Sequence, residues 1–260
     1  MNSILGFFDY KNGNTGTMFS FEHIIYMIIA LAILAILPIL LRNVNHKKID
    51  IYLKVITFVV PLTDLAKIIW ETYYYRLNGY GNFEYTGLLP LYLCSLFMIC
   101  LPFASFFKGI IKDIALSFLT TIGIVGGISN VFYLNMLNYY PLIHYASFSS
   151  IFYHIMMVFT GVWLLSSRYY KLNKYSPLKA FIPVLLLSFI AIPVNNYLNT
   201  DYMLLNRADG APLLPLISSL LHDNNLGFLF IFIMFGVYIG VGYLIYGIYL
   251  LIYKIYKKKY

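Results

Sequence analysis

Seven long apolar runs constrain this chain more than any other feature of its sequence. A helix needs about 20 mainly apolar residues to cross the hydrocarbon core of a bilayer. Only 11% of the 260 residues are charged and the mean hydropathy is +0.77, whereas about a quarter of the residues in a soluble domain are charged. We therefore predict an all-α integral membrane protein, one polytopic domain over residues 1–260. Its seven transmembrane helices are expected at about 21–41, 51–73, 87–107, 114–136, 143–166, 179–199 and 226–253.

Basic residues are distributed unevenly between the connections. Thirteen Lys and Arg lie between the first and second runs, the third and fourth, the fifth and sixth, and in the C-terminal tail. The opposite side carries only Lys11, Arg76 and Arg207. Because Lys and Arg in short loops stay cytoplasmic, the pattern predicts an outside N-terminus and a cytoplasmic C-terminus. An even number of helices would break this alternation, so the pattern also favours seven.

Several function classes are excluded or disfavoured at this stage. The net charge of +8 is explained by cytoplasmic loops, so we expect no nucleic-acid partner. Cys94 and Cys100 lie in one apolar run, which is not typical of a disulfide framework. No CxxC or HExxH spacing occurs, and we expect no metal and no cofactor. The first apolar run is longer than the apolar core of a signal peptide, so we interpret it as a retained helix. The oligomeric state is left open.

Three charged residues fall inside the second run. Asp64, Lys67 and Glu71 are spaced by three and four residues, so they share one face of a helix. Charges inside a membrane usually face a cavity, a bundle interior or each other. They are therefore interpreted either as a polar wall that binds substrate or conducts protons, or as a structural ion pair between helices.

Other polar side chains gather in the outer halves of the predicted helices. With a rise of 1.5 Å per residue, Cys94 would lie roughly 10 Å below the outer boundary and His154 roughly 15 to 18 Å below it. The inner halves are nearly free of such residues, so we predict a polar pocket that faces outward. Its expected members, beside the charges of the second run, are Cys94, Ser95, Asn130, His144, Ser147, His154, Asn195 and Asn196.

The longest connection, at about 200–225, contains two prolines and an apolar stretch from Leu213 to Leu221. This stretch is too short to cross a bilayer, and it predicts a short helix on the outer face. The connection, which includes Arg207, is either a lid over the pocket or a plain connector. Glycines at Gly123–Gly127 and at Gly236, Gly240 and Gly242 are assigned to close helix packing.

Three short segments resemble a known family. They are LPLYLCSL at 89–96, FSSIFYH at 148–154 and DYMLLNR at 201–207. The chain is similar over nearly its whole length to the YwaF-like bacterial integral membrane proteins, which are related to the transmembrane protein 164 (TMEM) acyltransferases. The resemblance implies a cysteine that accepts an acyl chain from a phospholipid and passes it to an acceptor lipid. Cys94 matches the nucleophile and His154 the activating histidine, but Tyr92 stands where the bacterial motif usually has His.

General chemistry is compatible with this interpretation. A thiol with a pKa of about 8.5 needs a base or a positive charge to become a good nucleophile, and His154 or Lys67 could provide one, with His144 as a second candidate base. Asn130, Asn195 or Asn196 could donate to the oxyanion, and Ser95, Ser147 and Arg207 complete the expected substrate contacts.

The leading hypothesis is therefore an acyltransferase or acyl hydrolase that acts on membrane lipids in a bacterial cell membrane. The alternatives are a transporter or solute-binding membrane subunit that uses Asp64, Lys67 and Glu71, and a non-enzymatic scaffold. Transporters often show internal repeats and broken helices near the membrane midplane. No repeat is visible in this sequence, which favours the enzyme.

Overall fold

The computed structural model describes residues 7–8, 15–77, 88–208 and 214–257, and these residues form helices without any strand. The all-α prediction is confirmed for this part of the chain. Five helical segments are long and apolar enough to cross a membrane: Phe21–Leu40, Gly109–Asn138, Tyr145–Ser166, Ser176–Leu198 and Gly227–Ile255. The main helices are α2 (Phe21–Leu40), α3 (His46–Leu77), α4 (Ser95–Phe106), α5 (Gly109–Thr120), α6 (Ile122–Phe132), α7 (Tyr145–Ser166), α8 (Ser176–Leu198), α9 (Leu214–Asp223) and α10 (Gly227–Lys257).

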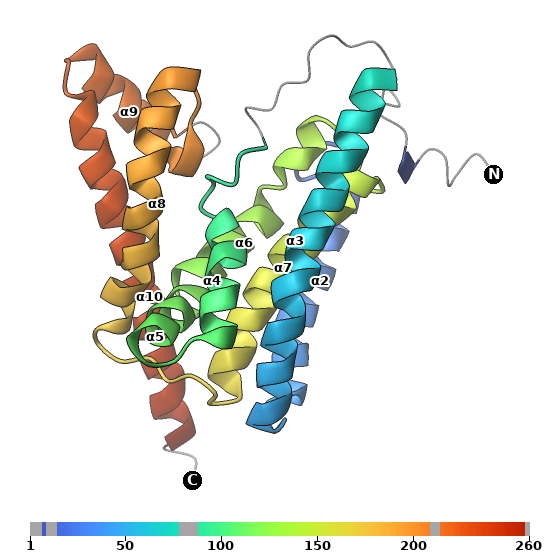
Figure 1. The fold of residues 1–260 in the computed structure, drawn as a ribbon, viewed down its shortest axis with the longest axis vertical. Helices are drawn as coiled ribbons and strands as arrows, with labels where there is room; N and C mark the ends of the chain where they lie inside the picture. Colours follow the sequence, from blue (N-terminus) through green and yellow to red (C-terminus); the bar gives the residue numbers. More distant parts are fainter. Residues whose placement is uncertain (1–6, 9–14, 78–87, 209–213, 258–260) are drawn as a thin grey trace.

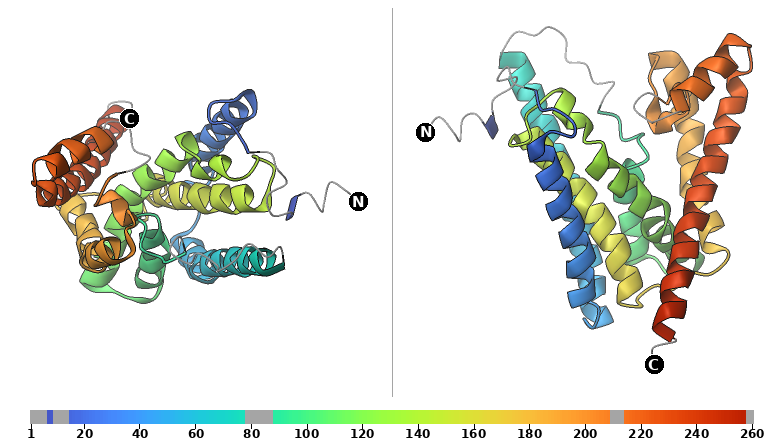
Figure 2. Two further views of the ribbon diagram at one scale, coloured as in Figure 1. Left: turned by 90° about the horizontal axis from the view of Figure 1, so that it is seen from above. Right: turned by 180° about the vertical axis from the view of Figure 1, so that it is seen from behind.

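The helices pack in two groups with a shorter set between them. Figure 1 shows α2, α3 and α7 on one side and α8, α9 and α10 on the other. The view from above in Figure 2 places α4, α5 and α6 between these groups. The long helices alternate in direction, since α2, α7 and α10 run one way along the bundle and α3 and α8 run the other way. α3 has 32 residues, but its charged side chains interrupt its apolar sequence.

The third predicted helix, expected from residue 87, begins later than its apolar run indicates. Residues 88–94 are turns and bends, and α4 begins at Ser95. Pro90 explains part of the difference, because it lacks a backbone N–H and disfavours helical geometry in the residue before it. As a result, α4 begins at mid-height of the bundle (Figure 1).

The fourth predicted helix, expected at 114–136, is divided in two. α5 ends at Thr120 and α6 begins at Ile122, with Thr121 between them at φ −129° and ψ −91°. The hydroxyls of Thr120 and Thr121 donate to the carbonyl oxygens of Leu116 and Ser117 at 2.6 Å each, and such bonds bend helices. The break lies where α7 packs against α5.

Glycines allow the close approach of α7 to its neighbours. A Cβ on Gly161 would lie 2.3 Å from the carbonyl oxygen of Leu119, and one on Gly127 would lie 2.5 Å from Val158 Cγ2. The packing role predicted for the first glycine stretch is thus confirmed at Gly127. It is wrong for Gly236 and Gly240, since a Cβ there meets no atom within 4 Å. These two positions lie on α10, where alanine would fit.

We expect Gly161→Ala to lower the free energy of unfolding by about 1–3 kcal/mol, the usual effect of overpacking. The added methyl group would force the backbone of α5 and α7 apart at the helix break. The same substitution at Gly240 is the matched control, and it should raise stability by up to about 1 kcal/mol because alanine favours a helix. Thermal unfolding in detergent would measure both. Equal effects at the two positions would contradict the importance of this contact.

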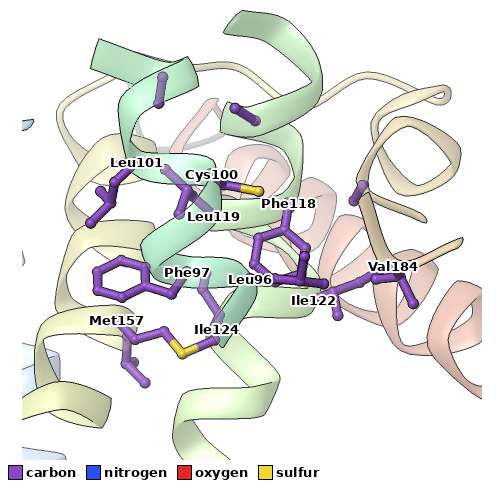
Figure 3. Packing of buried hydrophobic residues seen from close by; sticks show 14 of the residues in the cluster. Leu96, Phe97, Cys100, Leu101, Phe118, Leu119, Ile122, Ile124, Met157 and Val184 are labelled. Carbon is purple, nitrogen blue, oxygen red and sulfur yellow. The ribbon is translucent and has the colours of Figure 1, made fainter. Parts of the chain in front are cut away.

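The apolar core lies where α4, α5 and α7 meet. Phe97, Phe118 and Leu119 are almost fully buried there, and Figure 3 shows their side chains packed around Cys100. Cys100 is itself buried, and both cysteines are free thiols. This packing fixes the start of α4 relative to α7.

Candidate functional site

The inner face of α3 carries the three charges predicted to share it. Asp64, Lys67 and Glu71 are half-buried, whereas Leu62 and Ile69 on the outer face are 62% and 60% exposed. The common face of the three charges is thus confirmed, and it turns toward the bundle. The neighbouring apolar side chains face the surroundings, as expected of a helix in contact with lipid.

The charges on α3 form no ion pair within 4 Å among the described residues. The ion pairs found in this part of the chain are Lys112–Asp50 at 3.5 Å and Lys179–Asp113 at 2.5 Å, both at the end of the bundle where α5 begins. The alternative of a close structural ion pair on α3 is therefore not supported.

Cys94 stands at the N-terminal end of α4. Its carbonyl oxygen accepts the backbone N–H of Phe97 at 2.9 Å. The N-terminus of a helix has a partial positive charge that favours anions, and cysteines in such positions are often reactive.

Tyr153 joins Cys94 to α7. Its hydroxyl donates to the carbonyl oxygen of Cys94 at 2.9 Å, and its ring packs against Phe97 at 5.7 Å between centroids. The next residue is His154, whose Nδ1 lies 2.8 Å from the carbonyl oxygen of Ser150. A carbonyl can only accept, so a neutral His154 has its proton on Nδ1 and leaves Nε2 as a base. The contact joins the start of α4 to the helical turn of α7 that carries His154.

His144 and Ser147 hold the beginning of α7. His144 is fully buried, its Nδ1 accepts the backbone N–H of Ala146 at 3.2 Å, and its ring stacks on Tyr140 at 4.4 Å. The Ser147 hydroxyl donates to the carbonyl oxygen of Pro141 at 2.9 Å. These contacts explain both side chains by helix capping and packing, which makes His154 the better candidate base.

The three candidate amides have different surroundings. Asn195 binds the backbone of Tyr202 twice, donating to its oxygen at 3.0 Å and accepting from its N–H at 2.7 Å. Asn196 is exposed and lies on another face of α8. Asn130 has a buried Oδ1 without a hydrogen-bond partner in the described residues. Asn195 thus anchors a loop, and Asn130 is the amide with a free buried polar atom.

The long connection is partly folded onto the helices. The predicted short helix is confirmed as α9 (Leu214–Asp223), while residues 209–213 lie outside the described part of the chain. Asp201 Oδ1 accepts the backbone N–H groups of Asn206 and Arg207 at 2.9 and 3.0 Å. Arg207 is exposed and donates to the carbonyl oxygen of Asn199 at 3.1 Å. Ser218 of α9 donates to the carbonyl oxygen of Asn206 at 2.8 Å.

A groove of about 270 Å³ runs between α3 and α7, and it includes Leu62 of the outer face of α3. It is lined by apolar side chains together with Thr63 and Ser149, and its walls include Ala66 and Phe152. On α3 the lining positions Leu62 and Ala66 are exposed, whereas Asp64, Lys67 and Glu71 are half-buried and face the bundle.

The site contains no metal-binding cluster. Among the described residues, no group of three or more His, Cys, Asp or Glu side chains is arranged to hold a metal ion. Its chemical groups are one thiol, one imidazole, several phenols and the charges of α3.

Comparison with known proteins identifies the family. A family model described as the TMEM164 family matches residues 18–246. The chain belongs to the TMEM164 family. No curated protein and no solved structure matches it. The predicted relation to transmembrane protein 164 is thus confirmed, and the match covers every candidate site residue from Asp64 to Arg207. Family membership together with the apolar helices makes this TMEM164-family chain a multi-pass membrane protein.

Proposed function

We propose that this TMEM164-family protein is a lipid acyltransferase, or an acyl hydrolase, that forms a thioester on Cys94. The observation that carries the proposal is the hydrogen bond from Tyr153 to the Cys94 carbonyl oxygen at 2.9 Å. It joins a thiol at a helix N-terminus to the turn of α7 that carries His154. The resemblance to the TMEM acyltransferases assigns the same two residues to the chemistry.

The reaction divides into two half-reactions. His154 Nε2 takes the Cys94 thiol proton, and the thiolate attacks the ester carbonyl carbon of a phospholipid. The lysolipid oxygen leaves with the proton from the imidazolium, and a thioester remains on Cys94. An acceptor hydroxyl then gives its proton to Nε2 and attacks the thioester, which restores the thiol. Water as acceptor gives the hydrolase.

Charge stabilisation would come from groups around the thiol. The Lys67 ammonium lies on the face of α3 that turns toward the bundle, and backbone N–H groups at the start of α4 favour negative charge. Asn130 is the remaining candidate among the three amides for a contact with the oxyanion. The groove beside Ala66 and Phe152 is suited to a hydrocarbon chain, because its wall is mainly apolar and opens to the surroundings.

The membrane arrangement is part of the same proposal. We propose seven spans, formed by α2, α3, α4, the pair α5 and α6, α7, α8 and α10, with the N-terminus outside and the C-terminus cytoplasmic. The positive-inside distribution of Lys and Arg supports this orientation. The site would then open to the outer leaflet of a bacterial cell membrane, where phospholipids serve as substrates.

Intact-protein mass spectrometry after incubation with phospholipid would test the proposal. We expect the mass to rise by one acyl group, and hydroxylamine should remove this group because it cleaves thioesters. A control reaction that contains phospholipid but no enzyme, measured by thin-layer chromatography, gives the background rate of lysolipid formation. Lysolipid formed without any adduct would contradict a thioester mechanism. The absence of both lysolipid and adduct with several different acceptors would contradict it as well.

A second function is favoured by a different observation. The charges of α3 lack close ion pairs among the described residues, and two apolar runs are broken, at the start of α4 and at Thr121. Transporters build substrate sites at such breaks. If the chain is a transporter, Lys67→Met should abolish solute uptake by proteoliposomes, whereas Cys94→Ala should leave it intact. A non-enzymatic scaffold would show neither acyl transfer nor uptake.

A further inference from the structure

Tyr202 is the most deeply buried unpaired phenol in the described residues. Its side chain is 1% exposed, and its hydroxyl has no hydrogen-bond partner in this part of the structure. A buried hydroxyl without a partner is unfavourable, and most native structures avoid it. The position therefore needs an explanation other than packing, since phenylalanine would fill the same space.

The surrounding loop fixes Tyr202 firmly. Asn195 binds both the N–H and the carbonyl oxygen of Tyr202, and the hydroxyl of Tyr238 donates to the carbonyl oxygen of Met203. Met203 and Leu204 have φ angles of 56° and 54°, a conformation that is unfavourable for residues other than glycine. The fold thus maintains strained backbone directly after an unpaired hydroxyl. Strain of this kind is concentrated at functional sites.

The Tyr202 ring connects this loop to the segment that carries Cys94. It packs edge-on against Tyr92, with 4.9 Å between centroids and 69° between ring planes. Tyr92 lies two residues before Cys94 in the chain. Tyr202 thus contacts the segment that carries Cys94 through Tyr92, and its loop is held by Asn195 of α8 and Tyr238 of α10.

We propose that the Tyr202 hydroxyl donates a hydrogen bond to an ester oxygen of the lipid that binds beside Cys94. This role rests on the proposed acyl-transfer function, for which it supplies a substrate contact. Burial raises the pKa of Tyr202, so the phenol keeps its proton and remains a donor. The substrate oxygen would fill the hydrogen-bonding capacity that the protein leaves open.

Tyr202→Phe tests the proposal, because it keeps the ring against Tyr92 and removes only the hydroxyl. We expect kcat/KM for adduct formation on Cys94 to fall about tenfold, the usual effect of one lost hydrogen bond to a neutral group. The unfolding temperature should not fall, since the hydroxyl has no protein partner to lose. Tyr238→Phe is the matched control: it removes a bond to the loop backbone and should lower the unfolding temperature.

Binding measured without chemistry separates this proposal from the proposed function. In a Cys94→Ala background, a fluorescent short-chain phosphatidylcholine should bind about tenfold more weakly after Tyr202→Phe. Unchanged binding, or a lower unfolding temperature for Tyr202→Phe, would overturn the role of Tyr202 whether or not the wild type forms an adduct. If Tyr202→Phe weakens binding but the wild type forms no adduct, the contact between Tyr202 and the lipid is supported and the thioester mechanism is rejected.

Discussion

Replacing Cys94 with serine should remove the acyl adduct and slow acyl transfer on the order of 10⁴-fold or more, as expected for loss of a nucleophile. Serine keeps the size of the side chain and can still interact with the N–H groups at the start of α4. Its hydroxyl is a much weaker nucleophile than a thiol, which is partly ionised near neutral pH. The rate of lysolipid production and the mass of the intact protein would measure the effect together.

Cys100 provides the control within the same helix. It is a free thiol that is 2% exposed, in the core formed by α4, α5 and α7, so Cys100→Ala should lower stability without removing the adduct. If Cys94→Ser still acquires a hydroxylamine-sensitive acyl group, the nucleophile is another residue. If only Cys100→Ala abolishes it, Cys100 is that residue.

The sequence predicted those features well that residue spacing and the length of apolar runs determine. The shared face of Asp64, Lys67 and Glu71 follows from their spacing, and the structure turns that face inward. The short helix after residue 213 followed from an apolar stretch that is too short to span a bilayer. These are local properties, and neighbouring helices do not need to be known to derive them.

Helix breaks were missed because hydropathy does not register backbone geometry. The hydropathy of an apolar run is the same whether the whole run is helical or the helix begins partway along it, as α4 does at Ser95. Pro90 was the available signal. The break at Thr121 depends on threonine hydroxyls that bind carbonyl oxygens in the preceding turn, and the close approach of α7 at Gly161 follows from tertiary packing. A uniform helical rise therefore does not apply to residues 88–94, which precede α4.

Tyrosines were the residues whose role the sequence concealed. The chain has 26 of them, and tyrosines in membrane proteins commonly anchor helices at the membrane interface. Tyr153 binds the Cys94 backbone and Tyr202 packs on Tyr92, contacts between segments far apart in sequence. Conversely, Asn195 was a candidate oxyanion donor, but its amide holds a loop. Which polar residue anchors the fold and which is free for a ligand is decided by partners that only the folded chain supplies.

His154→Ala should slow formation of the Cys94 adduct by about 10²- to 10⁴-fold near neutral pH, the contribution typical of a general base. The bond between Nδ1 and the Ser150 carbonyl oxygen orients the ring and leaves Nε2 to accept the thiol proton. Without this base, hydroxide must remove the proton, so the rate of the variant should keep rising with pH where that of the wild type has levelled off.

His144→Ala is the control: it removes the cap of α7 and should lower stability, yet leave the shape of the pH profile unchanged. A His154→Ala protein with wild-type rates and a wild-type profile would show that Cys94 is activated by something else, and the Lys67 ammonium would then be the remaining candidate, to be tested by Lys67→Met.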